Sequence, residues 1–309
     1  MARRRKGDAV SGWVNLDKPR GLGSTAAVAR VRRAFNAQKA GHAGTLDPLA
    51  SGVLPIALGE ATKTVPFLMD ANKAYRFTIR WGVETASFDA EGAVTAVCDA
   101  RPNSVAVTEA LSAFVGEIDQ LPPAFSAVKV GGARAYDLAR KGISVPLSAR
   151  KVVIHQARFI GSADADHADF EIECGKGTYV RALVRDLASR LGVRGHVSEL
   201  RRTRVGRFDE ASAIALESLE SLCHRGAPLE ALLPVETALD DIPEQAVTAE
   251  DAFRLTQGRS IVLLPRQVET LAARLGASRM VSARHGERIV ALCEMRAGRL
   301  SPTRVFHLA

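Results

Sequence analysis

One short segment of the chain combines a carboxylate with a backbone suited to holding it in place. Asp47 is the only acidic residue between positions 41 and 59, and His42 is the only other side chain there that titrates near neutral pH. Pro48 drives Asp47 away from helical backbone, and the glycines around it allow close approach or positive φ. The segment therefore predicts a loop that presents one oriented carboxylate to a group that comes close.

A structural explanation of the same residues competes with this functional one. Asp followed by Pro is a common helix start, with Asp as the N-cap and Pro in the first helical position. Residues 49–58 contain Gly52 and Pro55, which fit poorly inside a helix. A structural turn and a functional loop both stay open on these residues alone.

A longer match surrounds the aspartate. The stretch from Gly41 to Lys63, GHAGTLDPLASGVLPIALGEATK, resembles the signature of the TruB family of tRNA pseudouridine synthases, whose catalytic aspartate stands in a G-x-L-D-P context. The resemblance covers residues 10 to 210 well and the remainder more loosely. Further family-like segments follow in the expected order: Asn15–Pro19, Lys73–Phe77, Phe125–Lys129, Gly175–Arg181 and Leu200–Thr203.

The resemblance implies both a fold and a reaction. The fold would be α+β, the pseudouridine synthase fold with a mixed, mainly antiparallel central sheet. The reaction would convert the T-loop uridine at tRNA position 55 to pseudouridine, by breaking the N-glycosidic bond, rotating the uracil and rejoining it through carbon. This isomerisation has no net redox change, so we expect no cofactor and no metal.

The same resemblance implies three catalytic residues. Asp47 would be the essential carboxylate, and it could attack C1′ of the ribose, add to C6 of the base or assist elimination across the sugar. Tyr75 would stack on the flipped uracil or act as a base, although its position also fits an ordinary core aromatic. Arg181 would pair with Asp47 and keep it ionised, whereas in isolation it reads as a solvated helix residue.

Five further residues are implied as substrate-binding. His42 would fill the space vacated by the extruded uridine, because a planar ring can stack there, and a turn histidine is the equally open alternative. Leu200 would wall the uracil pocket and Lys18 would support the loop, with a core leucine and a surface lysine as their plainer explanations. Tyr179 and Lys129 come from the family-like segments that contain them.

Composition favours a polyanionic partner. The 309 residues include 42 Lys and Arg against 34 Asp and Glu, a formal net charge of +8 and a pI near 9.6. Basic residues cluster at 3–6, 30–33 and 194–207. The four cysteines are widely spaced without zinc-ligand spacing, and no apolar stretch resembles a signal peptide or a membrane span. We expect reduced thiols, no membrane association and a cytoplasmic protein.

Periodicity predicts the elements that position these residues. A strand at 12–16 precedes a helix capped by Ser24 or Thr25, and alternation predicts strands at 75–81 and 170–174. A helix is expected at 108–115, and a second, capped by Thr178, should end at Gly192. We expect a basic arm at 1–10, a catalytic domain at 11–235 with a mobile basic excursion at 124–151, and a PUA-like RNA-binding β-barrel at 244–309.

Two other functions stay in view. The chain could be the catalytic subunit of a guide-RNA-dependent pseudouridine synthase, or an RNA-binding or RNA-folding protein without catalysis. The compact C-terminal tail resembles the bacterial stand-alone type more than the longer guide-dependent relatives. We therefore expect a monomer that acts on the T stem-loop of tRNA without an obligatory protein partner.

Overall fold

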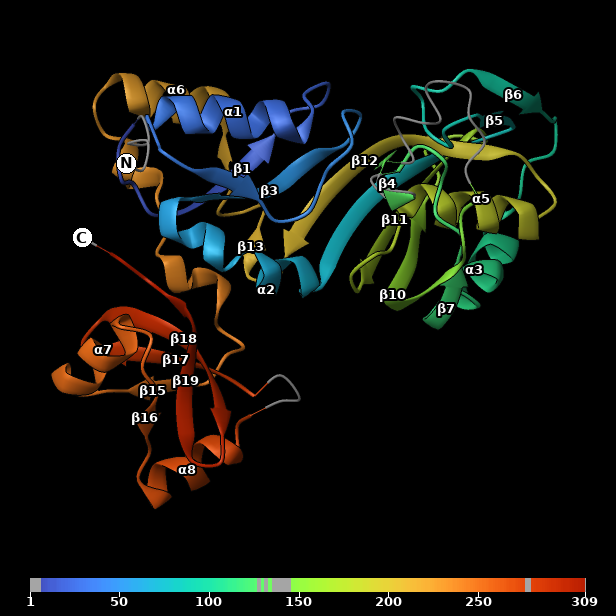
Figure 1. Ribbon diagram of the computed structural model, residues 1–309. Coiled ribbons are helices and arrows are strands. Elements are labelled where there is room, and N and C mark those ends of the chain that lie inside the picture. The colour runs from blue at the N-terminus through green and yellow to red at the C-terminus, as the bar shows by residue number, and fades with distance from the viewer. Residues whose placement is uncertain (1–6, 127–128, 131–132, 135–145, 276–278, 309) are drawn as a thin grey trace.

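Two β-sheets organise the chain in the computed structural model, which describes residues 7–126, 129–130, 133–134, 146–275 and 279–308. A ten-stranded sheet spans the larger part, and a five-stranded sheet occupies the C-terminal part, below it in Figure 1. The combination of sheets with separate helices confirms the predicted α+β class.

The large sheet is mixed and mainly antiparallel, as predicted. Its order is β14-β1-β3-β12-β4-β11-β10-β7, with β13 beside β12 and β2 beside β3. Among the strands that the structure describes in this sheet, β1–β14 and β12–β3 are the parallel pairs. The strands are β1 Gly12–Lys18, β2 Ala40–His42, β3 Ser51–Leu58, β4 Lys73–Trp81, β7 Gly116–Gln120, β10 Arg150–Gly161, β11 His167–Cys174, β12 Gly195–Val205, β13 Phe208–Asp209 and β14 Ile214–Ala215.

Helices cover the two halves of this sheet separately. Figure 1 shows α1 (Ser24–Ala34) and α6 (Leu216–His224) over the half that holds β1 and β3, and α5 (Val180–Arg190) and α3 (Ser104–Ser112) against the half that holds β10 and β11. Each half has its own buried apolar cluster. The large sheet therefore consists of two separately packed halves that meet at β12 and β4.

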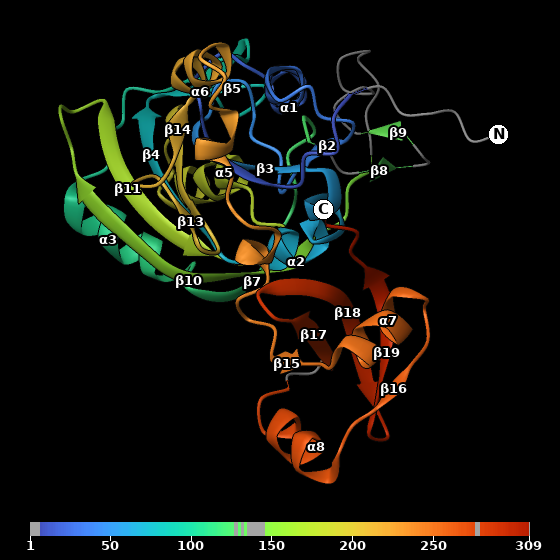
Figure 2. The same cartoon turned by 90° about the vertical axis from the view of Figure 1, so that its left-hand side faces the viewer.

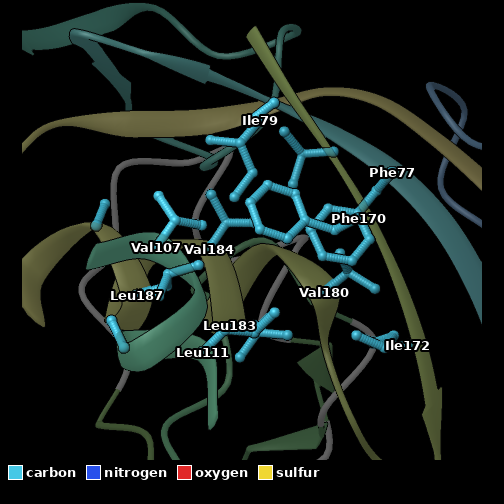
Figure 3. Close-up of a cluster of buried hydrophobic side chains, with 14 of the residues drawn as sticks. Phe77, Ile79, Val107, Leu111, Phe170, Ile172, Val180, Leu183, Val184 and Leu187 are labelled. Carbon is cyan, nitrogen blue, oxygen red and sulfur yellow. The ribbon is translucent and has the colours of Figure 1, made fainter. Parts of the chain in front are cut away.

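Alternation of buried and exposed side chains along the strands forms the core of the half that holds β10 and β11. Phe77 and Ile79 of β4 and Phe170 of β11 are almost fully buried, whereas Arg76 and Arg80, at alternate positions of β4, are exposed. These rings and branched chains pack on the apolar face of α5, including Leu183, as Figure 3 shows. Full burial of each such side chain contributes about 1.5–3 kcal/mol. The predicted strands at 75–81 and 170–174 are confirmed, and so is the end of α5, since Gly192 follows it with φ +67°.

The helix starts differ from the predicted caps. Gly23, not Ser24 or Thr25, is the N-cap of α1, and Tyr179, not Thr178, is the N-cap of α5. Neither helix has a side-chain cap, because the Ser24 hydroxyl bonds Leu46 instead and the Thr178 hydroxyl donates to the carbonyl of Gly175. The helix predicted at 108–115 begins earlier, at Ser104, since the Asn103 side chain accepts from the N–H of Ala106.

The Asp47 segment is shorter than the predicted loop. Residues 40–42 and 51–58 are strands, so the loop proper is residues 43–50. β3 tolerates a proline at position 55. On one edge of β3, residues 51–52 pair with β12 and residues 56–58 pair with β2. Pro55 lies between these two ranges, so its missing N–H breaks neither ladder. No helix follows Asp47, which removes the helix-cap explanation of Asp-Pro.

Shorter elements lie between the main strands and helices of the larger part. They are η1 Gly59–Lys63, α2 Val65–Asp70, β5 Val83–Thr85, β6 Val94–Val97, β8 Lys129–Val130, β9 Ala133–Arg134, η2 Pro228–Ala231 and η3 Val235–Ala238. Most of the predicted basic excursion at 124–151 lies outside the described residues. Its described end differs from the prediction, because Arg150 and Lys151 already pair with β7 as the first residues of β10.

The C-terminal sheet has the order β15-β17-β18-β19-β16. Its elements are β15 Glu244–Ala246, α7 Ala249–Thr256, β16 Ile261–Val262, α8 Pro265–Ala272, β17 Met280–His285, β18 Arg288–Arg296 and β19 Arg299–Val305. Thr248 caps α7 by accepting from the N–H of Asp251. The unpredicted helix α8 begins at Pro265, a favoured first position.

The two sheets share buried side chains. Leu292 and Phe306 of the C-terminal part belong to one apolar cluster with Trp13, Leu68 and Phe208 of the larger part. Figure 2 shows the C-terminal sheet close beneath α2 in a view turned from that of Figure 1. Apolar burial therefore fixes the C-terminal sheet against the larger one.

Candidate active site

One pocket collects most of the residues that the sequence singled out. It has a volume of about 240 Å³ and lies where β4 and β12 meet the start of α5. Five of the eight predicted site residues line it, from four separate elements: Asp47, Tyr75, Tyr179, Arg181 and Leu200.

An ion pair joins the two central groups of this pocket. The Arg181 Nη2 lies 2.7 Å from the Asp47 Oδ2. The Arg181 side chain is 5% exposed and that of Asp47 is 37% exposed. The carboxylate is therefore oriented by the guanidinium on one side and open to the pocket on the other.

Arg181 is held in place independently of Asp47. Its guanidinium donates to the carbonyls of Ser87 (3.1 Å) and Phe125 (2.8 Å), and its Nη1 lies 3.5 Å from the Asp89 carboxylate. The Asp89 side chain is 5% exposed and accepts from the Ser87 hydroxyl and the Glu91 N–H. Nothing in the sequence marked Asp89, because it approaches Arg181 only through the fold. The guanidinium is preorganised before any substrate arrives.

The Asp47 loop is anchored on both sides of the carboxylate. Leu46 is buried in the cluster of the β1–β3 half, whereas Leu49 is buried in the cluster of the β10–β11 half. The Leu46 N–H and carbonyl both bond the Ser24 hydroxyl at 2.8 Å, and the Gly21 N–H donates to the carbonyl of Pro48. These contacts fix the backbone of the loop on both sides of Asp47.

Gly52 allows β3 and β12 to touch at the end of this loop. Its φ is +98°, and a Cβ there would lie 2.2 Å from the carbonyl oxygen of Arg202. We expect Gly52→Ala to lower the free energy of unfolding by about 3 kcal/mol or more, since it adds left-handed strain to a backbone clash. Urea denaturation measures this. Gly226→Ala, with φ +78° and no atom within 4 Å of its Cβ, should cost clearly less. Equal losses of unfolding free energy in the two variants would contradict a clash between the added Cβ and the Arg202 carbonyl.

Two phenols face the pocket in their neutral form. Burial raises the pKa of Tyr75 above its ordinary value, although a hydrogen bond with the Arg202 side chain partly opposes this. Burial also raises the pKa of Tyr179. Both hydroxyls are therefore protonated near neutral pH, and both rings offer flat surface beside the carboxylate.

Lys18 is not on the pocket surface. Its side chain is fully buried, and its ammonium donates to the carbonyls of Pro19 and Leu22. Burial lowers its pKa to about 8, while the nearby Asp47 carboxylate opposes that shift. Lys18 pairs with Gly52 at the end of the Asp47 loop, and its substrate-binding role stays a prediction.

Lys73 is a pocket residue that sequence reasoning missed. It is 7% exposed, lines the pocket and donates to the carbonyls of Met69 and Ala71 at 2.6 Å each. Burial lowers its pKa to about 8. Its place in the same alternation as Tyr75, two residues before it on β4, was the available signal.

The buried ammonium of Lys73 predicts a pH dependence of stability. Between pH 8 and 10.5 the unfolded chain binds this proton and the folded chain does not, so its contribution to the free energy of unfolding rises with pH. Relative to Lys73→Met, the native chain should gain about 1–2 kcal/mol between pH 7.5 and 9.5, measured by urea denaturation. The exposed Lys176 is the control, since Lys176→Met should show no such gain. If the difference in free energy of unfolding between the native chain and Lys73→Met does not change with pH, burial does not lower the pKa of Lys73.

The remaining predicted residues lie outside the pocket lining. His42 ends β2, directly before the loop, and it does not line the pocket as described. Lys129 lies in the short ladder between β8 and β9, and its side chain is outside the described residues.

The basic cluster at 194–207 is not a free cationic patch. Arg194 pairs with Glu84, Arg201 with Asp17 and Glu210, Arg204 with Glu173, and Arg207 with Asp240. His196 and Arg202 are buried. On α1, Arg30 pairs with Glu220, whereas Arg32 and Arg33 are exposed. The net positive charge is therefore largely neutralised in this segment.

No group of three or more metal-ligating side chains comes together within the described ranges. All four cysteines are free thiols. Of the helices that the structure describes, none has the length and apolar character needed to cross a bilayer. The pocket lining brings together an oriented carboxylate, the buried guanidiniums of Arg181 and Arg202, the Lys73 ammonium and two neutral phenols.

Comparisons with known proteins identify the family and agree with the fold. The family model described as TruB family pseudouridylate synthase (N terminal domain) matches residues 32–180, and the model described as tRNA pseudouridylate synthase B C-terminal domain matches residues 181–240. The chain is 68% identical over 309 residues to tRNA pseudouridine synthase B of Caulobacter vibrioides, covering 100% of both chains. It is 54% identical over 312 residues to the protein of the same name from Nitrobacter winogradskyi, covering 99% of this chain and 85% of that one.

Solved structures share the fold. A chain in the crystal structure of a Cbf5-Nop10-Gar1 complex superposes with a TM-score of 0.72 at 26% identity, covering 96% of this chain and 85% of that chain. A chain in an H/ACA RNP bound to a substrate RNA containing 2'-deoxyuridine gives a TM-score of 0.72 at 22% identity, covering 100% and 92%. The chain thus shares its fold with these two solved chains, and the family models place it among the pseudouridylate synthases. Within that class the chain belongs to the TruB family of pseudouridylate synthases.

Proposed function

We propose that this protein isomerises a uridine of tRNA to pseudouridine, and that the uridine is the T-loop residue at position 55. The observation that carries the proposal is the Asp47 carboxylate, bound by Arg181 at 2.7 Å and open to a pocket lined by Tyr75. The relatives at 68% and 54% identity, both tRNA pseudouridine synthases B, support tRNA as the substrate.

Each pocket residue has a proposed role. Asp47 initiates cleavage of the glycosidic bond, and Arg181 keeps the carboxylate ionised and aimed. Tyr75 offers a ring on which the detached uracil stacks, so that the base is retained while it rotates. Leu200 and Tyr179 close the walls of the pocket and limit access of water. The reaction transfers no electrons to an external acceptor, and the proposal needs no cofactor.

The substrate base must leave its stack to reach this pocket. Extruding a stacked base costs a few kcal/mol, which contacts in the pocket and a group filling the vacated space offset. We assign the filling role to His42, which directly precedes the Asp47 loop on β2. Recognition of the RNA then rests on loop shape and phosphate contacts more than on base reading.

We also propose a division of labour along the chain. Residues 11–235 form the catalytic domain, residues 244–309 a PUA-like RNA-binding domain, and the basic residues at 3–6 an arm that contacts phosphates. The five-stranded order of the C-terminal sheet is compatible with such a module. The protein would act as a monomer in the cytoplasm, without an obligatory protein partner.

The direct test uses purified full-length protein and an unmodified tRNA transcript. We expect pseudouridine at position 55, detected by carbodiimide modification and primer extension, with no other macromolecule added. A transcript with cytidine at position 55 is the control. Product at another uridine would overturn the assigned position, and absence of product would overturn stand-alone activity.

A guide-RNA-dependent activity is the second candidate. The similarity to a chain solved in a Cbf5-Nop10-Gar1 complex, at 26% identity, is the observation that favours it. The full-length match to tRNA pseudouridine synthase B at 68% identity favours the stand-alone enzyme more strongly. The same transcript assay separates them, since a guide-dependent enzyme would be inactive alone.

A further inference from the structure

Arg202 is the largest buried charged side chain in the pocket wall that has no role in the reaction proposed above. It is 1% exposed, and it lines the pocket together with Leu200. Alternation along β12 explains this, because Leu200 and Arg202 face the pocket while Arg201 turns away to Asp17 and Glu210. Burial of a guanidinium is costly unless its donors are satisfied, so its partners show what it does.

Those partners lie on both sides of Asp47 in the chain. The Arg202 Nε donates to the carbonyl of Val53 (2.7 Å), and its Nη2 donates to the carbonyl of Gly44 (3.1 Å). Gly44 has φ +97°, and a Cβ added there would lie 3.4 Å from the Arg202 Nη1, so the guanidinium packs closely against this glycine. One planar group thus ties both ends of the catalytic loop to β12.

The same guanidinium reaches the second proposed catalytic residue. Arg202 and Tyr75 are paired neighbours on β12 and β4, and the two side chains share a hydrogen bond. Three features of the site therefore meet at one side chain: the start of the loop, its end and the Tyr75 hydroxyl. An ammonium has no planar fork that could span these acceptors.

We propose that Arg202 is a positioning residue for the reaction proposed above: it fixes the Asp47 loop at both ends and fixes the Tyr75 hydroxyl relative to that loop. The expected effect of Arg202 on kcat rests on the proposed function. Its expected effect on the order of the loop rests on the geometry alone. Arg202 touches the backbone on either side of Asp47 and the Tyr75 side chain, and it acts through them.

The test compares Arg202→Met and Arg202→Lys with Arg201→Met, a neighbouring arginine whose contacts lie elsewhere. We expect Arg202→Met to lower kcat on tRNA by about 100-fold, the usual effect of a small misplacement of reacting groups, with KM nearly unchanged. Arg202→Lys should recover little of this loss, because it restores the charge without the fork. Arg201→Met should keep kcat. Wild-type kcat in folded Arg202→Met, or full recovery in Arg202→Lys, would overturn the proposal.

Hydrogen exchange of the free proteins gives a readout that does not depend on activity. In Arg202→Met, amides of residues 43–53 should exchange faster, while amides of the C-terminal sheet keep their native rates. Uniformly faster exchange would mean general destabilisation and would contradict a positioning role. If Arg202→Met does not fold, Arg202→Lys carries the same comparison. A wild-type chain inactive on tRNA would refute the proposed function, while the exchange data would still decide whether Arg202 fixes the loop.

Discussion

Asp47→Asn is expected to lower the rate of pseudouridine formation by at least about 10³-fold while tRNA binding stays close to that of the native chain. Loss of a reacting carboxylate has effects of this size or larger in other enzymes. The amide has nearly the same shape, and it can still meet Arg181 through its oxygen. The carboxylate is open to the pocket on its free side, so the substitution removes reactivity with little change in packing. Single-turnover assays and filter binding on the same tRNA transcript measure the two effects separately.

Asp70→Asn is the matched control for this substitution. Asp70 lies on α2, its side chain is 65% exposed, and it pairs with Lys176 outside the pocket lining. It should retain turnover, because an exposed ion pair contributes little. Turnover near the native rate in Asp47→Asn would remove this carboxylate from the mechanism and would favour an RNA-binding protein without catalysis.

Arg181→Met is expected to lower kcat by at least about 10²-fold and to destabilise the fold. The activity falls because Asp47 loses the guanidinium that orients it at 2.7 Å. The fold loses about 3–5 kcal/mol because Asp89, 5% exposed, is left as a buried charge without its cation. Turnover kinetics and urea denaturation report these two losses independently.

A double variant separates the two roles of Arg181. Arg181→Met combined with Asp89→Asn should recover much of the lost stability, since the uncompensated charge is removed, but should stay as inactive as Arg181→Met. The two groups are in direct contact, so their effects on stability should not add. Recovery of turnover in the double variant would show that Arg181 serves only the fold. A variant impaired only in tRNA binding would mean that it is a phosphate contact instead.

Local patterns were enough to predict the elements that carry the site. The alternation through Tyr75 and Phe77 predicted β4, and the apolar stripe closed by Gly192 predicted α5 with Arg181 in its first turn. The resemblance to a known family then added the pairing of Asp47 with Arg181, which spacing alone could not give. These two residues are far apart in sequence and meet only because the loop and the start of α5 line one pocket.

The missed residues share a physical cause. Asp89, Lys73 and Arg202 are charged side chains whose burial depends on partners distant in sequence or on backbone carbonyls. Nothing local distinguishes Asp89 and Arg202 from solvated charges, which are far commoner. For Lys73 the alternation along β4 was a local signal. The misassigned caps have a similar origin, because the Ser24 hydroxyl bonds Leu46 across the fold in place of its own helix. Long-range contacts decided the positions of Ser24, Asp89 and Arg202, whereas Lys73 and Thr178 bond carbonyls close by in the sequence.

The anchoring of Leu46 and Leu49 in different clusters has a mechanical consequence. Asp47 is fastened to both halves of the sheet, whereas α5, which carries Arg181, packs within one of them. Any sliding of one half past the other would therefore change the separation of the two charged groups before it changed either core. The contact between the halves at β12 and β4 therefore controls fluctuations of the distance between carboxylate and guanidinium. The stability of either core matters less for this distance.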